Sequence, residues 1–90
     1  MKLLRWTAHA KKKATIREIA PLEVERTVAD PDWVAPAQPP RRIHNRRYFD
    51  ETLQMDVLLR VVIEETPTEL VIVTAYKTSQ LERYVREDRA

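Results

Sequence analysis

Four side chains in this sequence could together cleave a phosphodiester bond without a metal ion: His9, Arg60, Thr74 and Tyr76. Such cleavage needs a base for the 2′-hydroxyl, an acid for the leaving oxygen, and a cation for the charge that develops on the phosphoryl group. The histidine could act as the acid or the base, the arginine as the cation, and the two hydroxyls could position the phosphate. We therefore expect metal-independent ribonuclease chemistry if these residues converge.

Arg60 is the most unusual of the four, because it interrupts an apolar run between Leu58-Leu59 and Val61-Val62. A guanidinium in such surroundings is costly without an anionic partner. A phosphate is one such partner. The alternative is structural: Arg60 pairs with Asp56 or Glu64, or lies on a solvated face of the sheet.

The other three candidates each have an ordinary explanation as well. His9 falls in the first turn of an expected helix, where a surface or capping histidine is common. Thr74 and Tyr76 are two residues apart on an expected strand, so their side chains point to the same face. Taken alone, both are normal strand residues with a hydroxyl at the edge of the core.

Basic side chains gather in two segments, although the formal net charge is only +2. Residues 1–17 carry six of them and no acidic residue, and residues 41–47 carry four arginines around a histidine. A one-sided distribution of this kind can attract a polyanion. Arginines on an edge strand also block aggregation, which is the alternative explanation. The candidate nucleic-acid-binding residues are Lys12, Lys13, Arg17, Arg41, Arg42, His44, Arg46 and Arg47.

The composition argues against several other classes of site. Cysteine is absent, which excludes disulfides and thiol catalysis. Glycine is absent too, and P-loops, dinucleotide-binding turns and nucleophile elbows all need it. Only two histidines occur, at distant positions and outside any ligand motif, so we expect no metal and no cofactor. No segment approaches the roughly 18 apolar residues of a membrane span, so we expect a cytoplasmic protein without membrane contact.

The pattern of apolar residues predicts one α+β domain over residues 1–90. Thr7 is a suitable N-cap for a first helix, and Pro21 suits the first position of a second. Alternating apolar residues then predict strands, with Leu70–Tyr76 central or covered. The expected elements are helices 7–17 and 21–29, a proline-rich linker 31–40 with Trp33 as an anchor, strands 42–49, 54–65 and 69–77, and a short C-terminal helix 80–87.

Four short motifs occur in an order that resembles a known family: His9-Ala10, Asp30-Pro31, Leu59–Val62 and Val73–Tyr76. This arrangement over residues 6–77 resembles a widespread prokaryotic domain family of unknown function, which is grouped with the barnase–EndoU–colicin–RelE ribonuclease-like fold. The resemblance implies two N-terminal helices packed on a curled antiparallel sheet of three to four strands.

The resemblance also implies a function. It places an RNA-cleaving site on the open face of the sheet and gives His9, Arg60, Thr74 and Tyr76 the active-site roles. It further implies a RelE-type toxin of a toxin–antitoxin pair, with RNA and a cognate antitoxin protein as partners. Family members often have Arg-Gly-Ile where this chain has Arg17-Glu18-Ile19, so Lys13 or Arg17 must replace the usual helical arginine.

Two other functions fit the same sequence. The first is a non-catalytic module of the same fold that binds nucleic acid or a protein, in which the four arginines of residues 41–47 matter more than His9. The second is a small structural protein that forms a homodimer through pairing of the apolar strand 70–76.

Overall fold

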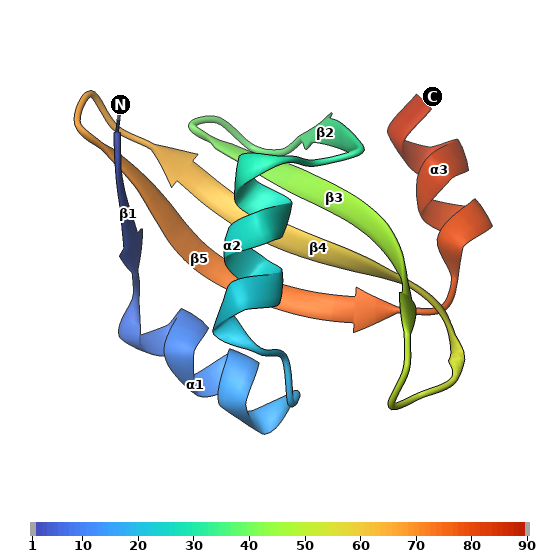
Figure 1. The fold of residues 1–90 in the computed structure, drawn as a ribbon. Coiled ribbons are helices and arrows are strands. Elements are labelled where there is room, and N and C mark those ends of the chain that lie inside the picture. Colours follow the sequence, from blue (N-terminus) through green and yellow to red (C-terminus); the bar gives the residue numbers. More distant parts are fainter. Residues whose placement is uncertain (1, 90) are drawn as a thin grey trace.

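The structure, a computed structural model, describes residues 2–89 and confirms the α+β class. These residues form three helices and one five-stranded mixed sheet, whose arrangement can be followed in Figure 1. The elements in chain order are β1 (Leu3–Trp6), α1 (Ala8–Ile16), α2 (Pro21–Ala29), β2 (Trp33–Pro36), β3 (Arg41–Asp50), β4 (Met55–Glu65), β5 (Glu69–Thr78) and α3 (Leu81–Arg89).

The sheet has the strand order β1-β5-β4-β3-β2, and it corrects the expected sheet in two respects. Strands β2 to β5 are antiparallel, whereas β1 runs parallel to β5, so the sheet is mixed. The expected three to four strands become five, because short strands β1 and β2 are added at the two edges. β2 lies inside the proline-rich segment expected to be a linker, and an edge strand tolerates a proline such as Pro36 at its end.

The three long strands were predicted to within one residue at each end. β5 lies between β1 and β4, as expected for a strand that is apolar on both faces. Its residues Leu70–Ile72 pair with β1 on one side and with β4 on the other. This part of β5 therefore has no free edge for a second copy of the chain, which was the interface of the homodimer alternative.

Both N-terminal helices begin where their capping residues predict. The Thr7 side chain accepts a hydrogen bond from the Ala10 N–H (3.0 Å), which satisfies one of the free donors of α1. Pro21 starts α2, where its missing N–H costs nothing. Asp30-Pro31 ends that helix, because a residue before proline avoids the helical conformation.

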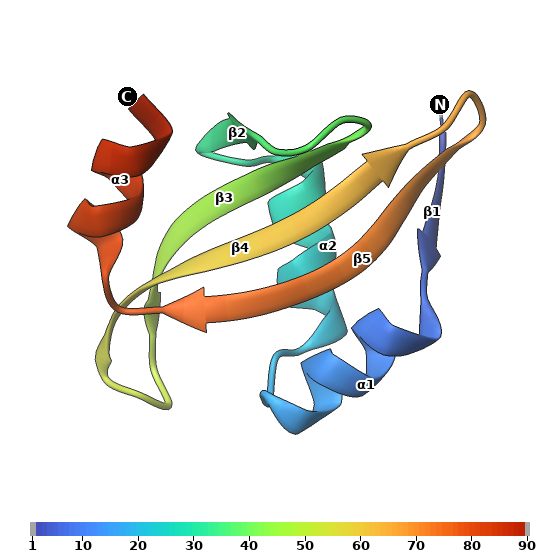
Figure 2. The same cartoon turned by 180° about the vertical axis from the view of Figure 1, so that it is seen from behind.

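The core lies between the sheet and α1 with α2, which cover the same face (Figure 1). Odd-numbered Leu59, Val61 and Ile63 of β4 point into it and are fully buried, each worth about 1.5–3 kcal/mol. Ala10 and Ala14 let α1 approach the sheet closely. Figure 2 shows the opposite face without α1 and α2 in front, with α3 beside the strands. None of the described helices has the length and apolar character needed to cross a bilayer.

Candidate nucleic-acid interface

Arg60 lies on the face of β4 that turns away from α1 and α2, and its side chain is buried (4% exposed). Its Nη1 atom lies 3.4 Å from Oδ2 of Asp88 in α3. Its guanidinium lies 4.0 Å from the ring centre of Tyr84 and 5.9 Å from that of Tyr76. Arg60 therefore has an anionic partner, as its apolar surroundings require. That partner comes from α3, whereas the sequence suggested Asp56 or Glu64.

The sheet separates His9 from Arg60. His9 is exposed on α1, which packs on the other face of the sheet, and α1 and α3 lie far apart in both views (Figures 1 and 2). Tyr76 lies directly opposite Arg60 on the neighbouring strand. Thr74 accepts a 3.4 Å hydrogen bond from Arg17 at the end of α1. The structure thus brings Arg60 and Tyr76 together but does not bring all four candidate catalytic residues to one place.

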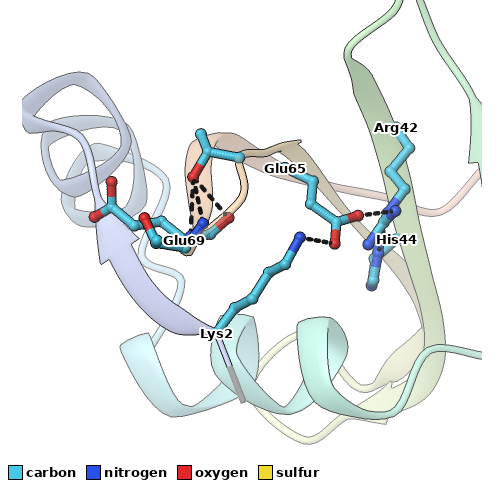
Figure 3. Close-up of polar contacts among 7 residues, drawn as sticks. Lys2, Arg42, His44, Glu65 and Glu69 are labelled. Atoms are coloured by element: carbon cyan, nitrogen blue, oxygen red, sulfur yellow. Dashed lines mark hydrogen bonds and ion pairs between the residues drawn. The ribbon is translucent and has the colours of Figure 1, made fainter.

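The first half of the basic strand is neutralised by acids at the end of β4. Arg41 pairs with Glu64 at 3.3 Å, and Arg42 pairs with Glu65 at 2.5 Å. Figure 3 shows Glu65 between Arg42 and Lys2, which also forms an ion pair with it. These two arginines are therefore already engaged within the protein.

His44 is buried and is a structural residue rather than a cation (6% exposed). Its Nδ1 atom lies 3.0 Å from the carbonyl oxygen of Val28, and its Nε2 atom accepts a hydrogen bond from Nε of Arg42 at 3.2 Å (Figure 3). Burial lowers the pKa of His44, and the adjacent Arg42 lowers it further. The neutral ring is thus held between α2 and β3.

The remaining candidate cations have no carboxylate within ion-pair distance among residues 2–89. Lys12 and Lys13 project from α1, and Arg17 follows that helix and donates to the carbonyl oxygen of Ala75 at 2.8 Å. Arg46 and Arg47 lie in the second half of β3 and point to opposite faces of the sheet. The structure therefore divides the expected basic strand into a paired half and an unpaired half.

Arg46 lines a cavity of about 450 Å³ between α2 and β3. Its guanidinium lies 5.2 Å from the ring centre of Tyr48. Phe49 lines the same cavity and is 52% exposed, and Arg26 enters it from α2. We call this surface the α2–β3 groove, and its walls also include Ala20, Leu22 and Glu23.

The floor of the α2–β3 groove is held by a polar network. The Tyr48 hydroxyl donates to Oε1 of Glu23 at 3.0 Å, and Glu23 also pairs with Lys77 at 3.4 Å. Burial and the adjacent Glu23 carboxylate raise the pKa of Tyr48 to about 12, so its phenol stays protonated at neutral pH. Burial disfavours the charge on Lys77, but its hydrogen bond to Asp50 and the adjacent Tyr48 hydroxyl raise its pKa above the usual value. The Tyr48 ring is therefore fixed in place beneath Arg46.

The groove offers two kinds of contact that nucleic-acid recognition uses. An exposed aromatic ring can stack on a base, and unpaired arginines can contact phosphates. Within the part of the chain that the structure describes, no cluster of three or more histidine, cysteine or acidic side chains could hold a metal ion.

Of the groove residues, only Arg46 was among the sequence candidates. Tyr48 and Phe49 directly follow the Arg46-Arg47 pair, and this mixture of basic and aromatic residues was the signal that could have identified them. Arg26 gave no such signal, because it lies alone on a helix and reaches the groove only through tertiary packing.

Comparison with protein-family models, with curated proteins and with solved structures finds no significant match to this chain.

Proposed function

We propose that this protein is a non-catalytic nucleic-acid-binding module that holds RNA in the α2–β3 groove. One observation carries the proposal: two arginines without a carboxylate partner among the described residues share a cavity with a half-exposed phenylalanine. Phosphate contacts supply most of the affinity of such proteins, and base stacking adds about 1–3 kcal/mol per base.

The geometry favours binding over catalysis. A catalytic cation must reach the phosphate, but Arg60 is buried beneath Tyr84 and paired with Asp88. A general acid or base must lie within hydrogen-bond reach of the reacting atoms, and His9 is on the other side of the sheet from Arg60. The ribonuclease and toxin assignments stay predictions from the sequence. A check of RNA cleavage tests the ribonuclease activity on which both depend.

The test is fluorescence anisotropy of labelled RNA oligomers at low salt, in the presence of EDTA. Removal of the exposed ring in a Phe49→Ala variant should weaken binding about 5-fold or more, because one stacking contact is lost. An Arg26→Ala variant should also weaken binding and reduce its dependence on salt. The labelled RNA is then run on a denaturing gel, where we expect it to be intact.

Two matched controls separate the groove from general effects. Leu3 is an exposed apolar residue on β1 (73% exposed), and Arg5 is an exposed arginine on the same strand that already pairs with Glu69 at 2.8 Å. Leu3→Ala and Arg5→Ala variants should bind RNA like the wild type. The proposal fails if the wild type does not bind, or if the control variants lose as much affinity as the groove variants. Cleaved RNA on the gel would favour the ribonuclease instead.

A further inference from the structure

The α2–β3 groove adjoins a second cavity of about 330 Å³ around the first turn of α2. The two cavities share Ala20 and Glu23 as walls. Arg17 and Leu53 line the second cavity only, and Arg26 and Phe49 line the first only. Together they make one trough, with Arg26 and Arg46 in the first part and Arg17 in the second.

Two of the three carboxylates along this trough, those of Asp50 and Glu23, are already used within the protein, whereas the exposed Glu18 has no ion pair among the described residues. Asp50 accepts hydrogen bonds from Lys77 at 2.8 Å and from the backbone N–H groups of Thr52 and Leu53 at 3.0 Å each. Glu23 accepts from the Tyr48 hydroxyl and from the Ala20 N–H. Because these acids are satisfied by internal donors, they repel an incoming anion less than free acids would.

Arg17 retains capacity for such an anion. A guanidinium carries five N–H donors, and the contacts of Arg17 within residues 2–89 use its Nη1 atom, which donates to Ala75 and Thr74. This anchor fixes the side chain at the cavity wall while the other nitrogen atoms remain available. A phosphate is a suitable acceptor for them.

Apolar side chains line both parts of the trough together with the arginines. Leu22, Phe49 and Leu53 are each more than half exposed. The combination of cationic and apolar contacts suits a single strand, whose bases are open to side chains while its phosphates lie along the backbone. A duplex hides the faces of its bases in the stack and cannot use these apolar contacts.

We infer that the trough binds a single-stranded polynucleotide across at least two successive nucleotides, with Arg26 and Arg46 on one phosphate and Arg17 on the next. The inference rests on the proposed function and adds the strandedness of the ligand and a second phosphate site. RNA and DNA share the bases and phosphates that this contact uses, so oligomers of both are needed in the test.

The first experiment compares ligands on the wild-type protein. Affinity should rise at least about 5-fold from a mononucleotide to a trinucleotide, because a second phosphate and base are engaged. A single-stranded oligomer should bind about 10-fold more tightly than the duplex of the same sequence. Equal affinity for single strand and duplex would overturn the inference but leave the proposed function standing, whereas no binding of any RNA would overturn the proposed function itself.

The affinities for single-stranded RNA and DNA of the same sequence should be similar. Tight binding of RNA alone would show that the protein recognises the 2′-hydroxyl, which would contradict a site built only on bases and phosphates.

The second experiment tests Arg17 through the salt dependence of binding. Each phosphate contact to a single strand contributes about −0.7 to the slope of log K against log salt. An Arg17→Gln variant should lose about that amount, and an Arg17→Lys variant should keep it because the charge remains. Lys11→Gln removes one charge from an exposed side chain of α1 that lines neither part of the trough, so its slope should match the wild type. If Arg17→Gln and Lys11→Gln have the same slope, Arg17 does not contact a phosphate and the second site is wrong.

Discussion

Arg42 and Arg46 lie on the same face of β3, four residues apart, and have opposite surroundings. Arg42 is held between the Glu65 carboxylate and the His44 ring (Figure 3). Arg46 lies over the ring of Tyr48 and has no carboxylate partner in the described part of the chain. Two identical side chains on one strand therefore have different roles: the first ties strands together, and the second faces a groove.

The register of the neighbouring strand explains the difference. Arg41 lies opposite Glu64 of β4, whereas Arg46 and Arg47 lie opposite Leu59 and Leu58. The two glutamates of β4 lie at one end of the strand, and Asp56 at the other end lies opposite Phe49 and forms no ion pair among the described residues, so β4 neutralises only the arginines opposite its glutamates. A cluster of basic residues in a sequence therefore predicts a basic surface only if the neighbouring strand has no acidic residues opposite it.

The largest effect should come from reversing the charge at each end of β3. Arg46→Glu should weaken RNA binding at least about 10-fold, because it replaces a phosphate contact by repulsion inside the groove. Arg41→Glu changes the net charge by the same amount at an exposed, already paired position and should cost less than about 3-fold. Anisotropy titrations at one salt concentration give both values. Equal losses would mean that net charge alone governs binding.

A smaller effect should come from removing the acid that neutralises Arg42. Lys2 and Arg42 both bind Glu65, and their hydrogen bonds to it lower the pKa of this carboxyl group. Glu65→Gln removes that shared partner, so the melting temperature should fall and RNA affinity at low salt should rise by about 2-fold because two cations are released.

Glu51→Gln is the matched control for this change. Glu51 is exposed in the β3–β4 turn, and its side chain has no ion pair with any described residue. The control variant should melt like the wild type. An unchanged melting temperature in Glu65→Gln would show that the ion pairs in Figure 3 do not stabilise the fold.

The comparison also shows which features were predictable from the sequence. β3, β4 and β5 were predictable because alternation of side chains is a local signal. β1 was not, because four residues are too few for a periodic pattern and its partner Glu69–Ile72 lies near the other end of the chain. β2 was obscured by the prolines around it.

The candidate site was less predictable than the fold, for the same reason. Arg46 belonged to a visible basic strand, but Arg26 joins it only because α2 packs over β3. For Arg60 the sequence suggested a partner on the same strand, and the structure supplies Asp88 from α3 instead. Local patterns reveal which side chains share a face, whereas their partners depend on contacts between distant segments.

The paired end of β3 should also make stability depend on pH. Because burial lowers the pKa of His44 below its usual 6.5, the unfolded chain takes up a proton there more readily than the folded protein. Stability from this residue is therefore complete above about pH 6.5 and decreases as the pH falls below that value, by at most about 1.4 kcal/mol per pH unit.

Urea denaturation between pH 7 and pH 5.5 measures this dependence. His44→Asn should flatten the dependence, whereas His9→Ala, a change at an exposed histidine, should leave it as in the wild type. The expectation is wrong if the wild type has the same stability at both pH values, or if the His9 variant flattens the profile equally.

The smallest effect is expected at Arg60, the arginine that the sequence made most conspicuous. Replacing both members of a buried ion pair by uncharged side chains of similar size is often neutral or stabilising, because the cost of burying two charges disappears, whereas removing only one member leaves the other charge buried without a partner. In the double variant Arg60→Met, Asp88→Asn, the amide oxygen at position 88 can keep the 2.7 Å hydrogen bond from Nε1 of Trp33, and a guanidinium whose Nε has no hydrogen-bond partner among the described residues is removed. The free energy of unfolding should change by less than about 1 kcal/mol.

The RNA affinity of this variant should equal that of the wild type, because Arg60 is remote from the α2–β3 groove on the other face of the sheet. If the wild type cleaves RNA and the equally stable double variant does not, Arg60 is catalytic after all, and α3 would have to move away from the sheet to expose it.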